Sequence, residues 1–132
     1  MIKTYTFDEL YAHGKGHPIG ERILDVVLPL LHTHPGWRVK TLAKHLGVKP
    51  NGLTATIHLL TGMTMETLLN KWRMYKALEL LKDTELTLEQ VAEQSGYTHY
   101  KHLAKAMKRE LRMTPYEYRH GFRRTVERPQ VN

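Results

Sequence analysis

Apolar residues recur every three or four positions along most of the chain, and from Trp37 to Tyr118 no two-residue alternation persists. A spacing of three or four places side chains on one face of an α-helix, whereas alternation is typical of a half-buried strand. The pattern therefore predicts an all-α protein of about seven helices. We expect these helices at residues 20–31, 39–47, 49–62, 65–82, 87–95, 99–111 and 114–124.

Residues that favour helix ends stand at several of these boundaries. Thr87 and Gln90 have the spacing of a capping box, and Thr114 precedes Pro115, a residue type that suits the first position of a helix. Pro29 lies inside the first expected helix, where its missing N–H is expected to kink or shorten that helix. These local signals support the boundaries that the apolar spacing suggests.

A repeated unit organises the chain. LAKHLG…LTATI starts at Leu42 and VAEQSG…LAKAM starts at Val91. In each copy an alanine comes next, a glycine follows four residues later, and a leucine then precedes another apolar residue by four. The small alanine allows two helices to pack closely, and the glycine supplies the freedom for a tight turn between them. Each copy therefore predicts a helix-turn-helix whose second helix has one buried face and one free face.

Two copies separated by a long helical segment predict two subdomains joined by a linker helix. Trp37 and Trp72 stand at apolar helical positions and are expected in the core. In the second copy, Leu103, Met107 and Leu111 are spaced to anchor the helix. The expected organisation is an N-terminal arm or loop at 1–19, a first subdomain at 20–64, a linker helix at 65–82, a second subdomain at 83–121 and a basic polar tail at 122–132.

The positive charge of the chain is concentrated near its C-terminal end. The formal net charge is +7, yet residues 1–98 hold eleven lysines and arginines against ten acidic residues, and residues 99–132 hold nine against three. A concentrated basic region is the electrostatic footprint of a protein that binds polyanions. On charge alone, a solvated basic tail explains the excess equally well.

Other features exclude several classes of protein. The absence of cysteine removes disulfides, thiol nucleophiles and cysteine zinc sites, and it fits a reducing cytoplasm. No apolar run is long enough to span a bilayer, and MIKTYTFDEL has acidic residues where a signal peptide needs an apolar segment. No phosphate-binding loop or nucleophile elbow occurs, and the nine histidines show no convergence toward a metal. We therefore expect a cytoplasmic protein with no enzyme activity, no metal, no cofactor and no membrane partner.

The second copy of the repeat and the segment after it resemble a known family. VAEQSGYTHYKHLAKAMKRELRMTPYEYR resembles the signature of the AraC/XylS-type transcription regulators, which reads A-x3-G-[FY], then a basic recognition helix with [FM]-K, then T-P-x-x-Y-R. In the long helix, RMYKALELL resembles the family's Arg-x3-Ala-x2-Leu-Leu. The resemblance covers roughly residues 37–119 and suggests the short form of the family, similar to MarA and SoxS. The matching positions are Arg73, Ala77, Leu80, Leu81, Ala92, Gly96, Tyr97, Met107, Lys108, Thr114, Pro115, Tyr118 and Arg119.

The resemblance implies two helix-turn-helix subdomains on one rigid linker, with both recognition helices in successive major grooves of double-stranded DNA. Such grooves recur on one face of the duplex about 34 Å apart. A single chain would then engage two half-sites as a monomer and contact RNA polymerase. The expected function is that of a transcription activator associated with a bacterial nucleoid. Residues 1–36 are too few for an effector-binding barrel, so no small-molecule effector is expected.

The second recognition helix gives the stronger signal for DNA. Lys101, Lys105, Lys108 and Arg112 follow one stripe of a helix beside its apolar face. Lysine can donate to guanine O6 and N7, and Lys105 stands where the family commonly has a base-reading arginine. The residues of this half expected to read bases are Tyr100, Lys101, His102 and Lys105, and those expected to contact phosphate are Thr98, Lys108 and Arg112.

The first recognition helix departs from the family pattern, because no lysine or arginine occurs between Lys49 and Lys71. Ala55 stands where the family often has arginine, although its methyl group could meet a thymine methyl and Asn51 could pair with adenine. The residues of this half expected to read bases are Asn51, Thr54, Ala55 and His58, and those expected to contact phosphate are Lys40, Lys44 and Lys49.

Alternatives to DNA readout by both helices remain open. The family's usual lysine pair is replaced here by His58 and Leu59, and Gly52 costs the helix about 1 kcal/mol relative to alanine. The first helix could therefore dock loosely or contact a protein. For the whole chain, one alternative is a protein-interaction module with degenerate DNA binding. Another is the DNA-binding half of a longer effector-responsive regulator, with HGKGHPIG as a residual linker.

Overall fold

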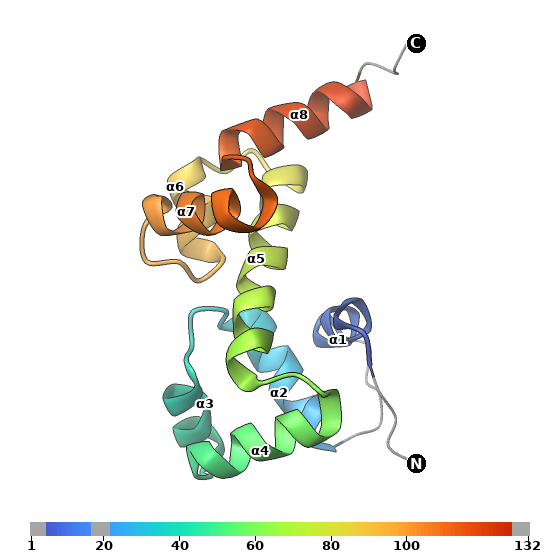
Figure 1. Ribbon diagram of the computed structural model, residues 1–132, viewed down its shortest axis with the longest axis vertical. Coiled ribbons are helices and arrows are strands. Elements are labelled where there is room, and N and C mark those ends of the chain that lie inside the picture. The colour runs from blue at the N-terminus through green and yellow to red at the C-terminus, as the bar shows by residue number, and fades with distance from the viewer. Residues whose placement is uncertain (1–4, 17–21, 128–132) are drawn as a thin grey trace. The chain divides into compact units, whose positions relative to one another are not determined.

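The computed structural model of the protein describes residues 5–16 and 22–127, with side chains described as far as residue 121. All regular structure in this part of the chain is helical, which confirms the all-α prediction (Figure 1). None of the described helices is long and apolar enough to cross a lipid bilayer. The helices are α1 (Phe7–Gly14), α2 (Arg22–Thr33), α3 (Val39–Leu46), α4 (Pro50–Thr61), α5 (Met65–Asp83), α6 (Leu88–Gln94), α7 (Tyr100–Leu111) and α8 (Pro115–Glu127).

α1 is the helix that the sequence pattern did not separate from the N-terminal arm. It begins with a capping box, in which the backbone N–H of Glu9 donates to the Thr6 hydroxyl (3.2 Å) and the Thr6 N–H donates to the Glu9 carboxylate (3.3 Å). Its other end lies close to α5, because a Cβ at Gly14 would stand 2.4 Å from a ring carbon of Trp72. Phe7 also meets Trp72 edge-on, with ring centroids 5.7 Å apart. α1 is therefore part of a hydrophobic core.

The chain forms two compact units, residues 1–72 and residues 73–132, which divide within α5. The buried side chains of the first core include Leu10, Leu24, Leu28, Leu42, Leu53, Ile57, Leu68 and Trp72. Those of the second core are Met74, Ala77, Leu81, Val91, Ala92, Leu103, Ala106 and Met107. Each half of α5 thus belongs to a different core, and the division falls inside the linker helix predicted at 65–82.

In the first unit the tryptophans lie as the sequence predicts. Trp72 is fully buried, and Trp37 is half-buried against the same core. Pro29 lies inside α2 without shortening it, since the helix continues to Thr33. Proline removes one hydrogen-bond donor and leaves its own carbonyl available. That carbonyl accepts a bond from the Thr33 hydroxyl (2.9 Å).

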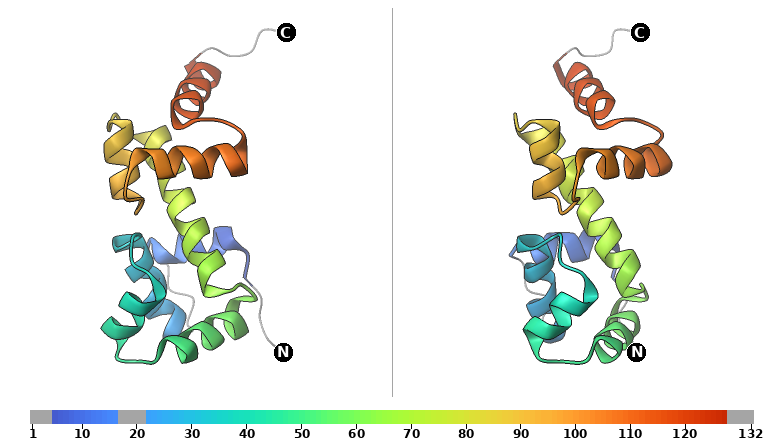
Figure 2. Two further views of the ribbon diagram at one scale, coloured as in Figure 1. Left: turned by 60° about the vertical axis from the view of Figure 1, so that its left-hand side comes forward. Right: turned by 90° about the vertical axis from the view of Figure 1, so that its left-hand side faces the viewer.

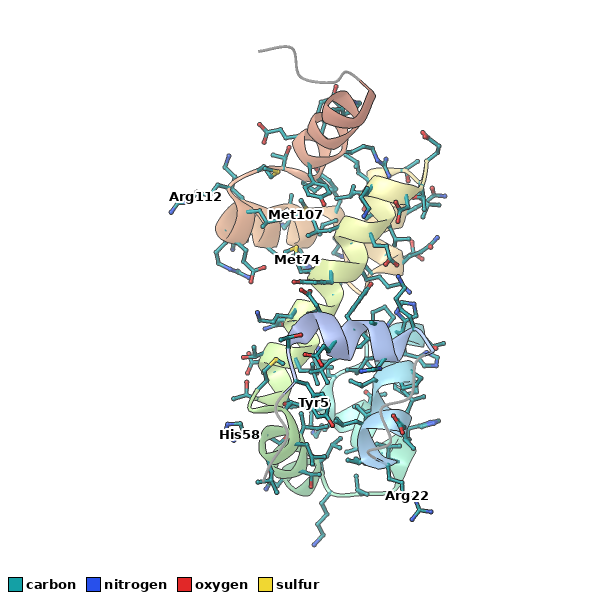
Figure 3. All side chains as sticks on the ribbon, turned by 90° about the vertical axis from the view of Figure 1, so that its right-hand side faces the viewer. Tyr5, Arg22, His58, Met74, Met107 and Arg112 are labelled. Atoms are coloured by element: carbon teal, nitrogen blue, oxygen red, sulfur yellow. The ribbon has the colours of Figure 1, made fainter. Side chains whose placement is uncertain are left out.

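In the second unit one predicted core residue is wrong. Leu103 and Met107 are fully buried, and Figure 3 shows Met107 beside Met74 inside the unit. Leu111 is instead 36% exposed. Each step of four residues turns a side chain about 40° around the helix, and in α7 the third member of the series lies at the edge of the buried face. Ala106, three residues after Leu103, completes the buried face in its place.

The turns of the two helix-turn-helix pairs have the same geometry. In both, the glycine has a positive φ (71° and 98°), where a side chain would strain the backbone. In both, the residue after the glycine donates its N–H to the carbonyl of the buried alanine (3.0 and 2.9 Å). Figure 2 shows that the two helices of each pair then cross. The residues are Ala43, Gly47 and Val48 in the first pair and Ala92, Gly96 and Tyr97 in the second.

Arg119 has a structural role that the sequence does not reveal. The side chain is 8% exposed, and its guanidinium donates hydrogen bonds to the carbonyls of Leu81 (3.0 Å), Leu86 (2.6 Å) and Thr84 (3.2 Å). These carbonyls belong to the last turn of α5 and the loop after it, where no intrahelical donor is available. Arg119 therefore ties α8 to the connection between α5 and α6.

Candidate nucleic-acid interface

The outward face of α7 carries a row of cations. Lys101, Lys105 and Arg109 are exposed and stand four residues apart, so they share one face of the helix. Leu103 and Met107 are fully buried on the other side. The helix is thus held by one face and presents three positive side chains on the other. Arg109 is not among the predicted site residues, although its spacing from Lys105 is a sequence signal that identifies it.

Two further cations lie at the C-terminal end of α7. Lys108 and Arg112 are both exposed, and Figure 3 shows the Arg112 side chain projecting away from its unit. Arg112 stands one residue beyond the helix, with φ 59°, so it follows the predicted stripe of cations without being part of the helix. Hydrogen bonds from Thr114 and, to a lesser extent, the charge of Lys108 lower the pKa of Glu117 at the start of α8. Lys108 itself remains exposed and available to an anion.

The residues at the start of α7 differ in exposure. Thr98, Lys101 and His102 are exposed, whereas Tyr100 is half-buried and packs against the second core. The backbone N–H of Tyr100 donates to the carboxylate of Glu89 on α6 (3.4 Å). Among the predicted base-reading residues of this half, Tyr100 is thus the one whose ring supports the helix.

Tyr97, in the turn before α7, is a second support. Its ring packs against the second core. Burial raises the pKa of Tyr97 to about 12, although the charges of Arg73 and Arg109 favour the ionised form. Its hydroxyl is therefore neutral at physiological pH, and the residue contributes packing at the point where α7 begins.

The outward face of α4 has a different composition. Asn51, Ala55 and Leu59 are exposed and stand four residues apart, and Leu59 is 64% exposed. His58 is also exposed, and Figure 3 shows it projecting from α4, whereas Thr54 is half-buried. No lysine or arginine lies on α4. The helix therefore offers an amide, an imidazole and two apolar groups to a partner.

Positive charge in the first unit lies beside α4. Lys40 and Lys44 on α3 and Lys49 just before α4 are exposed. Lys40 and Lys44, with Val48 and Pro50, line a shallow depression of about 360 Å³. Lys49 is the N-cap residue of α4 and makes no side-chain capping bond, and the first turn holds no acidic residue. The amide groups at this helix end and the three lysines suit phosphate groups of a polyanion.

The two outward faces occupy matching positions of the repeat. Residues of α7 stand 50 positions after their counterparts on α4, as the buried pairs Leu53 with Leu103 and Ile57 with Met107 show. At four exposed positions of α4 the matching position of α7 holds a cation. The pairs are Asn51 with Lys101, Ala55 with Lys105, His58 with Lys108 and Leu59 with Arg109.

These observations define a class of protein. In each unit a first helix and a tight glycine turn hold a second helix by its apolar face, and that second helix keeps an exposed polar or basic face. This arrangement is the one by which helix-turn-helix proteins place a recognition helix in the major groove of DNA. Among the described residues, no three histidine or acidic side chains are arranged to hold a metal ion. The molecule is a double helix-turn-helix protein.

Comparison with known proteins identifies the family. A family model for the helix-turn-helix domain matches residues 42–121, and the chain belongs to the AraC-type branch of this family. An AraC-like transcription regulator of Streptomyces lividans is 30% identical over 103 residues, which are 76% of this chain and 34% of the relative. The HTH-type transcriptional regulator AlkR of Acinetobacter baylyi is 26% identical over 98 residues, 73% of this chain and 32% of the relative. The chain thus spans about a third of the length of the curated relatives it matches.

A solved structure supports the same conclusion. The DNA-binding domain of AdpA, a global transcriptional factor, determined in complex with a target DNA, has a TM-score of 0.66 and 27% identity to this chain. The match covers 80% of this chain and 94% of that domain. The resemblance to the AraC/XylS-type regulators is therefore confirmed, and the chain carries an AraC-type helix-turn-helix domain similar to the one that binds DNA in AdpA.

Proposed function

We propose that the protein recognises double-stranded DNA by placing α4 and α7 in two successive major grooves on one face of the duplex. The observation that carries this proposal is α7, which is held by a buried face and presents Lys101, Lys105 and Arg109 on the opposite one. Successive major grooves recur about 34 Å apart, so one chain would contact two half-sites about one helical turn apart.

On α7, the side chains of the outward row suit bases, and the cations and hydroxyl beside that row or beyond the helix suit phosphates. Lys101 and Lys105 would donate to guanine O6 and N7, and His102 would contact a neighbouring base edge. Lys108, Arg112 and Thr98 would bind phosphate groups and fix the position of the helix. Arg109 joins the base-facing row, because it continues the spacing of Lys101 and Lys105.

On α4, base contacts and phosphate contacts come from different elements. Asn51 would pair with adenine through its side-chain amide, and Ala55, His58 and Thr54 would lie against neighbouring bases. Lys40, Lys44 and Lys49 on α3 and the following turn would bind the phosphates on either side.

At the level of regulation, we propose that the protein acts without enzymatic chemistry as a transcription activator. It would bind as a monomer that contacts two half-sites. From the promoter it would contact RNA polymerase. This activity would take place in the cytoplasm of a bacterium, at its nucleoid. The relatives' names as transcription regulators support this role. Because the chain spans only a third of those relatives, an effector-responsive regulator of which this chain is the DNA-binding half is an alternative.

A second candidate function rests on α4. Its outward face lacks cations and exposes Leu59, which also suits a protein-interaction module with degenerate DNA binding. The two functions differ in salt dependence. A DNA binder that neutralises several phosphates loses affinity steeply as salt rises, whereas an interaction module shows little dependence for any residual DNA affinity.

Selection of bound sequences from random duplex DNA tests the proposal. We expect two short boxes about one helical turn apart. Lys105→Ala should relax one box and Asn51→Ala should alter the other more mildly, whereas Lys82→Ala, an exposed lysine on α5, should alter neither. The regulator function fails if no sequence is enriched at any salt concentration. A single box that Asn51→Ala leaves unchanged would restrict base readout to α7.

A further inference from the structure

α4 exposes a large apolar side chain in the last turn of its outward face. Leu59 is 64% exposed, and it stands four residues after Ala55 on the side opposite the buried Leu53 and Ile57. The matching position of α7 holds Arg109. Ala55 and Leu59 together form a short apolar strip, which is bounded by Asn51 at one end. A strip of two side chains is too small for a stable protein–protein interface.

Gly52 gives an independent indication that something approaches this face closely. A Cβ at Gly52 would meet no atom within 4 Å, and its φ is not in the positive range that favours glycine. Neither packing nor backbone conformation therefore requires glycine at this position, although glycine weakens the helix. A missing side chain in the first turn of α4 lets a partner come near the backbone, where α7 has His102 instead.

The surroundings of the strip indicate the chemistry of the partner. Lys40, Lys44 and Lys49 lie on the preceding helix and turn of the same unit and are exposed. An uncharged helix face flanked by cations suits a polyanion whose charge lies at its edges and whose centre offers apolar groups. In the major groove of DNA, phosphates line the edges and the thymine methyl is the apolar group that bases present.

We infer that Ala55 and Leu59 read thymine methyl groups, so that the half-site under α4 is rich in A·T pairs and the half-site under α7 contains guanines. This inference rests on the proposed function and adds the base composition of each half-site. Asn51 fits the same half-site, since an amide pairs with adenine N6 and N7. The cations Lys101, Lys105 and Arg109 fit the other, since guanine presents two acceptors in the major groove.

Deoxyuridine tests this inference directly, because uracil differs from thymine only by the methyl group. The probe is the duplex selected by the protein from random DNA, with thymines of one box replaced by uracils. Burying one methyl group contributes about 0.8 kcal/mol, so each critical replacement under α4 should weaken binding about fourfold. The same replacement in the α7 box should leave the dissociation constant unchanged.

Three variants complete the test. Leu59→Ala should lose the preference for thymine over uracil at the base that Leu59 contacts and keep it at the base under Ala55, and its exposed position makes it a safe change for folding. Leu59→Arg, which copies Arg109, should shift selection in that box toward guanine. Gly52→Ala should raise the melting temperature and weaken DNA binding, because a side chain then stands between the helix and the duplex.

The outcomes separate this inference from the proposed function. Failure to enrich any duplex overturns both. A duplex that is bound specifically, yet with no preference for thymine over uracil, overturns the inference alone. Guanine enrichment under α4 also overturns the inference alone. An unchanged thymine preference in Leu59→Ala has the same consequence. Loss of transcription activation in Leu59→Ala with unaltered DNA binding would assign the strip to a protein partner instead and overturn the inference.

Discussion

The two helix-turn-helix pairs share a backbone design and differ in chemistry. Both place a buried alanine, a glycine of positive φ and the same backbone bond at the turn, with a distance of 3.0 Å in one and 2.9 Å in the other. The second helices bury two matching pairs, Leu53 with Leu103 and Ile57 with Met107, and four of their exposed positions also correspond. Every exposed counterpart differs, however, with three uncharged residues and a histidine on α4 against four cations on α7. The two copies thus share the buried positions that hold the helices and differ in the side chains that they expose.

The units also differ in what stabilises them. The hydroxyls of Thr64 and Thr114 accept bonds from the third residue of α5 and α8 respectively, so the two helices begin alike. Five residues after these threonines the first unit has the buried Leu69 and the second has Arg119. The first unit has α1 in addition, packed on Trp72. One unit therefore relies on apolar burial where the other relies on a buried guanidinium.

The largest expected effect is the loss of that guanidinium. Arg119→Met should lower the free energy of unfolding of the second unit by about 3 kcal/mol, since the buried carbonyl of Leu81 and the partly buried carbonyls of Leu86 and Thr84 lose their donor. Thermal unfolding followed by circular dichroism measures the change. Lys82→Met, at an exposed position of the same unit, is the control and should leave the transition in place. An unchanged transition in Arg119→Met would mean that apolar burial suffices in both units.

A smaller loss is expected from the close contact of α1 with α5. Gly14→Ala should destabilise the first unit by about 2 kcal/mol, because the added Cβ overlaps the ring of Trp72 and must displace it. The measurement is the midpoint of urea unfolding. Gly52→Ala is the matched control, since a Cβ there meets nothing within 4 Å and should not destabilise. Equal midpoints for wild type and Gly14→Ala would show that α1 is not needed by its unit.

Arg119 and Gly14 show what the sequence could and could not predict. Helix boundaries were predictable because caps act locally. Thr87 and Gln90 form the predicted capping box, and Pro115 begins α8 as expected. The bonds of Arg119 join residues 33 to 39 positions apart, and such contacts leave no periodic trace in the sequence. α1 was missed although Thr6 and Glu9 have the spacing of a capping box, and only its contact with Trp72 is a distant one.

The candidate site was predictable to a different degree. A period of four identified Lys101 and Lys105, and the structure adds Arg109 and Leu59 by the same period. Exposure could not be read from spacing alone. Tyr100, a predicted base reader, is half-buried, and the same four-residue spacing ends in the buried Thr61 on α4 and in the exposed Leu111 on α7.

The next prediction tests whether the charges of the two recognition helices do unequal work. Lys108→Ala should lower the slope of log affinity against log salt by about 1 and weaken binding to all sequences alike, as expected when one phosphate contact is lost. His58→Ala, at the matching position of α4, should leave the slope unchanged, because His58 is proposed to lie against a base and not against a phosphate. Binding titrations at several salt concentrations provide both slopes. Equal slopes for the two variants would remove the electrostatic difference between the helices.

The smallest effect concerns the residues that end the two recognition helices. Gly62 ends α4 with φ 76°. Arg112 ends α7 with φ 59°, and among the described residues it is the one other than glycine that has a positive φ. Arginine in the left-handed region is strained, whereas glycine is not. Arg112→Gly should therefore stabilise the second unit by about 0.5 kcal/mol, after allowing for the greater freedom of glycine in the unfolded chain.

The same variant should weaken DNA binding, because the strained position keeps a cation at the end of α7 where a phosphate contact is proposed. Melting temperature and dissociation constant, measured on the same preparation, should thus move in opposite directions. Gly62→Arg is the reciprocal control, and it should lower the melting temperature because it introduces into the first unit the strain that the second already bears. If Arg112→Gly raises stability and leaves affinity intact, the arginine serves neither the fold nor the duplex, and the difference between the two helix ends has no functional meaning.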